Sequence, residues 1–156
     1  MQLKKRTPCV GICSTTYGDL VCRGCKRFAH EIVQWNGYDE AQQDAVRGRL
    51  QQVRDEVLQL LVRCDDEGLL RQALTDTGLE NLPAMDAQYE LMRFMVRRDQ
   101  PLASAGLAMV AGPVVDAQSA GREADDLDTL RLLKLIDTEC FERAKAHYER
   151  NFKVPA

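Results

Sequence analysis

Residues 9–25 read CVGICSTTYGDLVCRGC. Four of the six cysteines of this 156-residue chain lie within these seventeen positions, as a Cys-x3-Cys pair and a Cys-x2-Cys pair. Two thiolates this close in sequence can face one point, and a second pair completes a tetrahedron of sulfur ligands. The stretch therefore predicts one metal site with the ligands Cys9, Cys13, Cys22 and Cys25.

The residues around the cysteines fit tight turns. Gly24 precedes Cys25 and Gly11 lies between the first two cysteines, and glycine gives the backbone the freedom to direct amide groups at sulfur. Between the pairs, residues 15–19 have a turn-forming composition that suits a short hairpin. Both features favour a knuckle around a metal.

Other interpretations of the cysteines fit less well. Disulfides need an oxidising compartment, and no secretory signal precedes the cysteines. A redox Cys-x2-Cys motif needs a strand followed by a helix, which is missing here. A knuckle that uses Cys22, Cys25 and His30 would need a fourth ligand at Trp35, and tryptophan binds no metal. We expect His30 to be a solvated surface residue.

The motif resembles a known family. Its pattern is similar to that of small bacterial proteins that are catalogued as a domain of unknown function and labelled predicted iron–sulfur proteins. The residues that carry the similarity are Pro8, the two cysteine pairs, Arg23-Gly24, Glu31-Ile32 and Trp35. The resemblance covers roughly residues 7–50. It implies that the four cysteines are the functional residues and that they hold a metallocentre, and it names no reaction.

Spacing and resemblance favour different metals. Zinc and iron–sulfur clusters both use four thiolates. Common ferredoxin patterns place three cysteines close together and the fourth far away, whereas two pairs separated by a short turn are typical of structural zinc. Spacing therefore favours zinc, and the family label favours an iron–sulfur cluster.

The charge of the chain is unevenly distributed. The formal net charge is −3, but residues 1–27 carry +5, which leaves −8 for residues 28–156. A zinc ion with four thiolates has a charge of about −2, so the cations near the cysteines can neutralise such a centre. The alternative is a nucleic-acid-binding patch. The cations concerned are Lys4, Lys5, Arg6, Arg23, Lys26 and Arg27.

Helical periodicity dominates the rest of the chain. We expect helices over residues 26–35, 40–64, 69–74 and 84–98, and a last helix from about Glu123 to Asn151. Asp39 and Gln42 have the spacing of a capping box. In the 40–64 segment a narrow apolar stripe suits a helical hairpin or coiled-coil seam, and it would make Cys64 a buried structural residue. Its members are Val46, Leu50, Val53, Val57, Leu60 and Cys64. The stripe of the last helix comprises Leu127, Leu130, Leu133, Ile136, Cys140, Ala144 and His147. Residues 101–115 predict a packed loop or a strand-like insert.

The predicted fold is all-α, with a four-cysteine metal knuckle in residues 1–38 and a helical domain in residues 39–156. No apolar run reaches the roughly 20 residues that span a membrane, and the compartment expected is the cytoplasm. No catalytic motif accompanies the cysteines, which favours a non-catalytic metalloprotein whose centre folds a module that recognises another macromolecule, most simply a protein. Oligomers, a redox or electron-transfer role, and nucleic-acid binding are the alternatives.

Overall fold

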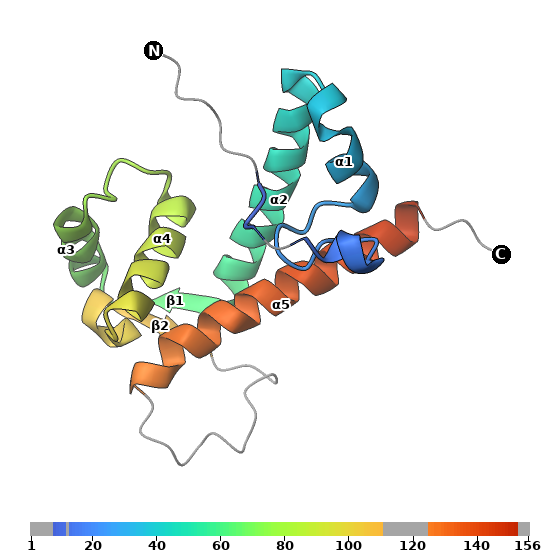
Figure 1. The fold of residues 1–156 in the computed structure, drawn as a ribbon. Coiled ribbons are helices and arrows are strands. Elements are labelled where there is room, and N and C mark those ends of the chain that lie inside the picture. Colours follow the sequence, from blue (N-terminus) through green and yellow to red (C-terminus); the bar gives the residue numbers. More distant parts are fainter. Residues whose placement is uncertain (1–7, 12, 111–124, 153–156) are drawn as a thin grey trace. The chain divides into compact units, whose positions relative to one another are not determined.

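The computed structural model describes residues 8–11, 13–110 and 125–152. Within these ranges the fold is mainly helical, as predicted, and only three-residue strands accompany the helices. Figure 1 shows the order of the elements along the chain. The α-helices are α1 (Ala29–Gln34), α2 (Glu40–Leu61), α3 (Glu67–Thr77), α4 (Ala84–Arg97) and α5 (Asp125–Asn151). The 3-10 turns are η1 (Ser14–Tyr17), η2 (Trp35–Gly37) and η3 (Leu102–Ala105), and the strands are β1 (Val62–Cys64) and β2 (Leu107–Met109).

The chain forms two compact units. The first unit comprises Met1–Arg54 and Glu139–Ala156, and the second comprises Asp55–Thr138. The first unit therefore contains the whole of the predicted 1–38 module together with the start of α2 and the end of α5. Three parts of the sequence predictions lie outside the described residues. They are the cations Lys4, Lys5 and Arg6, the expected start of the last helix at Glu123, and residues 111–115 of the expected insert.

Side-chain caps fix α1 and α2 of the first unit. Asp39 and Gln42 form the predicted capping box, in which each side chain accepts from the other residue's backbone N–H, at 2.8 and 2.9 Å. At the start of α1, the Glu31 carboxylate accepts from the Phe28 N–H at 2.8 Å. Arg49 of α2 donates to both oxygens of the same carboxylate, at 2.7 and 2.6 Å. Glu31 is buried, so this bidentate ion pair fastens α1 to α2.

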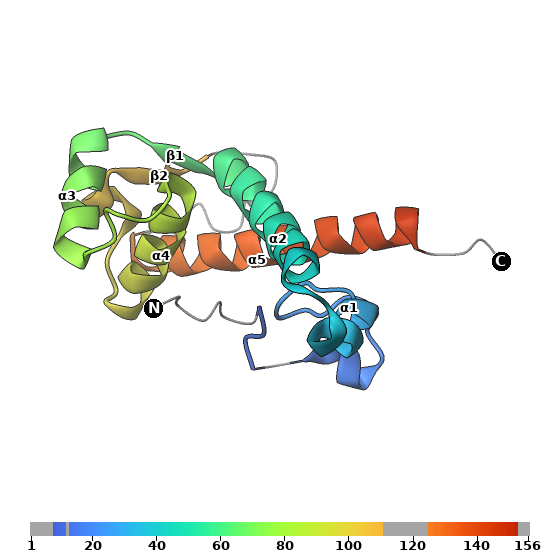
Figure 2. The ribbon, with the colours of Figure 1, turned by 90° about the horizontal axis from the view of Figure 1, so that it is seen from above.

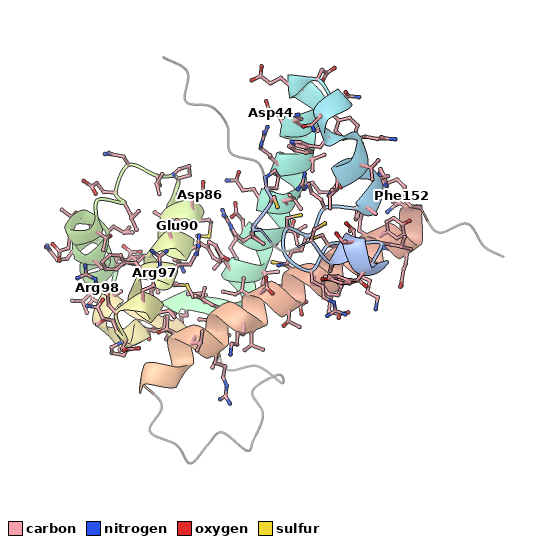
Figure 3. All side chains as sticks on the ribbon, viewed as in Figure 1. Asp44, Asp86, Glu90, Arg97, Arg98 and Phe152 are labelled. Carbon is pink, nitrogen blue, oxygen red and sulfur yellow. The ribbon has the colours of Figure 1, made fainter. Side chains whose placement is uncertain are left out.

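Aromatic rings form the core of the first unit beside this ion pair. Phe28 is only 1% exposed and packs with Val21 and Ala144 of α5. The Tyr148 ring lies 5.4 Å from the Phe28 ring, and the Phe152 ring lies 5.2 Å from it. Phe152 lies just beyond the end of α5 (Figure 3). These contacts attach the end of α5 to the segment that carries the cysteines.

A small sheet and a pair of packed helices build the second unit. β1 and β2 are antiparallel, with Val62 opposite Met109 and Cys64 opposite Leu107. This strand pair confirms the strand-like insert for residues 107–109. The helices α3 and α4 pack against each other (Figure 2). Its core consists of side chains that are almost fully buried, among them Val57, Leu58, Leu91, Met92, Met95, Leu107, Leu132 and Ile136.

The buried faces of the long helices differ from the predicted stripes. In α2 the stripe included Leu60, but that side chain is 57% exposed, whereas Leu58 is fully buried. In α5 the stripe included Leu130, which is exposed, whereas Leu132 is buried. Helix α2 also ends at Leu61, so Cys64 lies on β1 and is exposed, and the prediction of a buried helical Cys64 was wrong. A strict 3.5-residue repeat drifts away from the face of a straight helix, which has 3.6 residues per turn.

In the described part of the chain, no helix has both the length and the apolar character needed to cross a membrane.

The Glu31–Arg49 ion pair gives a pH-dependent prediction. Burial raises the pKa of Glu31, but the hydrogen bonds and charge of Arg49 and the Phe28 N–H outweigh this effect, so the pKa lies below its usual range. Glu31→Gln should lower the free energy of unfolding at neutral pH by about 2 kcal/mol, measured by urea denaturation. Since the folded pKa is below the unfolded value of about 4.3, the difference between the two proteins should shrink as pH falls below 4.

The control for this prediction is Glu139→Gln, which removes an exposed ion pair to Arg143 of 3.1 Å in the same unit. It should change stability by no more than about 0.5 kcal/mol. A Glu31→Gln difference that stays constant down to acidic pH would contradict the ion-pair account.

Glycine at position 106 gives a second prediction. Gly106 has φ 70°, and an added Cβ would collide with the carbonyl oxygen of Asp66. Its own carbonyl accepts from the N–H groups of Asp65 and Asp66, so the two backbones cannot separate easily. Gly106→Ala should cost about 3 kcal/mol or more. Gly78 has φ 72° with open space around it, so Gly78→Ala should cost only about 1–2 kcal/mol. Equal losses in thermal or urea unfolding would contradict the predicted collision.

Candidate metal centre

A tight hairpin holds the second cysteine pair. Val21 and Phe28 form an antiparallel bridge, and the Cys22 N–H donates to the Arg27 carbonyl at 2.9 Å. The Lys26 N–H donates back to the Cys22 carbonyl at 2.8 Å, which closes the turn. Lys26 has φ 65°, a left-handed conformation that is unusual for a residue with a side chain. The hairpin therefore lies at residues 21–28, and not between the two pairs as the sequence suggested.

The two sulfurs of this hairpin are buried and adjacent. Cys22 is 1% exposed and Cys25 is 8% exposed, and their thiol groups are within hydrogen-bonding reach of each other. Burial raises the pKa of Cys22, but backbone N–H groups of Cys25, Ser14 and Gly24 outweigh it and lower the pKa to about 7. Burial raises the pKa of Cys25, and Arg27 offsets this only in part. The pair thus gives up one proton easily and holds the second more tightly.

A buried cation adjoins the same pair. Arg27 is only 4% exposed, and its Nε donates to the Cys25 sulfur at 3.3 Å. Its guanidinium lies 4.8 Å from the centre of the Trp35 ring, and Arg47 lies 5.2 Å from the same ring. In the described part of the chain, Arg27 makes no ion pair with a carboxylate. The Cys25 sulfur is therefore the side-chain acceptor that the described residues offer to this guanidinium.

The first cysteine pair is more open. Cys9 is exposed and Cys13 is half-buried. The Gly11 N–H donates to the Cys9 sulfur at 3.3 Å, and Gly11 has φ 93°, as expected for a glycine in a tight turn. The Cys13 sulfur lies 2.8 Å from the hydroxyl of Thr15. In the first pair, Cys9 therefore accepts from a backbone N–H, as Cys22 does in the second pair.

Ser14 links the two pairs. It directly follows Cys13, and its side-chain oxygen accepts from the Arg23 N–H at 2.8 Å. Its backbone N–H is one of the groups that lower the pKa of Cys22. The segment after Cys13 is thereby anchored to the hairpin that carries Cys22 and Cys25.

The four cysteines do not form a closed ligand set. Among the described residues, no three Cys, His, Asp or Glu side chains are grouped so that they could hold one metal ion. The structure brings Cys22 and Cys25 together, and it anchors Ser14 beside them. All six cysteines lie in described parts of the chain, and no disulfide joins any of them. The donor set is all sulfur, which suits zinc or an iron–sulfur cluster.

The histidines belong to the aromatic cluster. His30 is exposed, as predicted, and its ring lies 5.1 Å from Phe152. His147 stacks on Phe28, with ring centres 5.7 Å apart and planes at 10°. Cys140 is buried on α5, as predicted. These residues are explained by packing within the first unit.

The role of Ser14 is not evident from the sequence pattern, in which Arg27 also counts only as one cation of a basic flank. A hydroxyl residue beside a predicted ligand was the available signal for Ser14. For Arg27 the signal was its spacing, because it follows Cys25 by two positions, as Gly11 follows Cys9 and Gly24 follows Cys22.

Comparison with known proteins finds a family model that matches this module. Residues 7–54 match the family described as Protein of unknown function (DUF1289). The matched segment contains all four cysteines, Arg27 and the Glu31–Arg49 pair, and it ends where the first segment of the first unit ends. The match confirms the resemblance to a domain family of unknown function, and the iron–sulfur part of that resemblance stays a prediction. No curated protein and no solved structure matches the chain.

The two cysteines outside the motif give a third prediction. Cys140→Ala should lower the free energy of unfolding by about 1 kcal/mol, because it leaves space in a packed helix face. Cys64→Ala should change it by less than about 0.5 kcal/mol, since Cys64 is exposed. Neither change should alter the metal content of the purified protein, measured by elemental analysis. Loss of metal in either variant would show that the ligand set extends beyond the four motif cysteines.

Proposed function

We propose that this protein is a non-catalytic cytoplasmic metalloprotein in which Cys9, Cys13, Cys22 and Cys25 hold one metal centre. The centre is zinc in preference to an iron–sulfur cluster, and it folds a small module that recognises another protein. The observation that carries the proposal is the Cys22–Cys25 pair, a buried pair of sulfurs at which backbone N–H groups and a guanidinium are directed.

An inert buried cysteine has a different environment. Such a residue packs as a small apolar group and needs no hydrogen-bond donors. Cys22 instead accepts from three backbone N–H groups, and Cys25 accepts from the backbone and side chain of Arg27. Donors that converge on sulfur stabilise negative charge there, and thiolate is the form that binds metal. The donors at the second pair therefore support its role as half of a metal site.

Metal binding would complete the site through the first pair. Cys9 is exposed and Cys13 is half-buried, so both sulfurs are accessible to an ion that is held by the second pair. Ser14, which follows Cys13, is already fixed at the hairpin. Coupling of ligand closure to metal binding is common in small metal-binding modules, because the metal supplies folding energy.

The surface of the first unit supports a protein partner. Leu20 is 56% exposed beside a hollow of about 220 Å³, whose walls include Val21, Phe141 and Tyr148. Tyr17, which is 89% exposed, lies next to this hollow in sequence. The lining also includes the charged residues Asp19, Arg23, Lys145 and Glu149. A hollow of this size, with apolar and charged walls, accommodates one large side chain of a partner.

The described cations give less support to nucleic-acid binding. Arg27 is buried, and the Lys26 ammonium donates to the Gly24 carbonyl at 2.9 Å. Arg23 contacts the Phe141 ring at 4.8 Å and the Asp19 carboxylate at 3.5 Å. All three side chains are therefore engaged within the module, although Arg23 stays accessible.

Anaerobic purification followed by measurement of zinc, iron and sulfide tests the proposal. We expect a colourless protein with about one zinc per chain. Cys22→Ser with Cys25→Ser should abolish binding, and Cys9→Ser with Cys13→Ser should reduce it strongly, whereas Cys140→Ala serves as the matched control. A brown protein with iron and sulfide would favour the redox alternative. A protein that binds no metal would contradict the proposed function.

A further inference from the structure

Arg27 is a buried cationic residue that makes no ion pair with a carboxylate among the described residues. Moving a cation out of water costs several kcal/mol unless a negative group compensates it. Arg27 is 4% exposed, and the polar contact of its guanidinium in the described part of the chain is Nε to the Cys25 sulfur, at 3.3 Å. A metal-bound thiolate is a stronger acceptor for this donor than a neutral thiol.

The Trp35 ring holds the guanidinium in place. Arg27 lies 4.8 Å from the ring centre, within the range of a cation–π contact. Trp35 is positioned in turn by α2, because Gln43 donates to its backbone carbonyl at 2.9 Å and Arg47 lies 5.2 Å from its ring. The Arg27 guanidinium thus contacts the Trp35 ring as well as the Cys25 sulfur, and α2 holds Trp35 in place.

The other described cations of the hairpin do not share this position. The Arg23 side chain is 70% exposed and faces Asp19 and Phe141. The Lys26 ammonium bonds to a carbonyl of the turn. Of these three neighbouring cations, Arg27 is therefore the one whose side chain meets a ligand sulfur.

We propose that Arg27 is the positioning residue of the metal centre: its guanidinium orients the Cys25 sulfur and balances part of the negative charge of a metal held by four thiolates. This inference rests on the proposed metal site. It predicts that the position of the charge matters, and not merely the net charge of the hairpin. Hydrogen-bonding partners of metal ligands typically change metal affinity 10-fold to 100-fold when they are removed.

The experiment compares zinc affinity of the full-length protein and its variants by competition with a chromophoric chelator. Arg27→Met keeps the length of the side chain and removes its charge, and we expect about 10-fold to 100-fold weaker binding. Arg27→Lys keeps the charge without the planar Nε donor, so its affinity should lie between those of Arg27→Met and the wild type. Arg23→Met is the matched control, because it removes the same charge from the same hairpin, and its affinity should stay within about twofold.

Salt dependence and a spectroscopic signal separate this role from a general charge effect. The ratio of wild-type to Arg27→Met affinity should persist from about 0.05 M to 0.5 M salt, since buried interactions are weakly screened. With cobalt in place of zinc, Arg27→Met should shift the sulfur-to-metal absorption bands, whereas Arg23→Met should leave them unchanged.

Three results would overturn the inference: equal losses in Arg27→Met and Arg23→Met, wild-type affinity in Arg27→Met, or wild-type affinity in Arg27→Lys. Circular dichroism would reveal whether Arg27→Met fails to fold. In that case the affinity of Arg27→Lys, compared with that of the wild type, tests the role of Arg27. Failure of the proposed function is distinguishable, because in that case the wild-type protein itself would bind no zinc.

Discussion

The contact between the Arg27 guanidinium and the Cys25 sulfur is the constraint on which the first unit depends. The Arg27 side chain is 4% exposed and its Nε donates to the Cys25 sulfur at 3.3 Å, so negative charge at this sulfur would strengthen the contact. The backbone stabilises negative charge at Cys22, because N–H groups converge on this sulfur. A bound metal would add to this stabilisation, since it keeps four thiolates together at one point.

The remainder of the first unit can be understood as support for this hairpin. Phe28 ends the hairpin and enters an aromatic core with Tyr148, while Glu31 accepts from both the Phe28 N–H and Arg49. The guanidinium of Arg49 also lies 4.2 Å from the centre of the Phe28 ring. Packing and a buried ion pair thereby hold the residues that follow Cys25.

Sequence reasoning reached the helical class, the capping box at Asp39 and the ends of α4 to within one residue, because caps and apolar periodicity are local signals. It misplaced Leu60 and Cys64, since a 3.5-residue pattern cannot indicate where α2 turns into β1. Spacing alone predicted the four candidate ligands, and their convergence on one metal stays a prediction. The burial of Arg27 could not be predicted, because it depends on Trp35 and α2, and a sequence shows a charged residue as solvated by default.

The most direct measurement of the central claim is X-ray absorption at the metal edge of anaerobically purified protein. If the two cysteine pairs converge on one zinc ion, the spectrum should show four sulfur atoms at about 2.3 Å and no nitrogen or oxygen ligand. An iron edge with sulfide and a nearby second iron would replace zinc by a cluster while keeping the four-cysteine site. Two sulfurs with oxygen or nitrogen ligands would contradict the account, because Cys9 and Cys13 would then take no part in the centre.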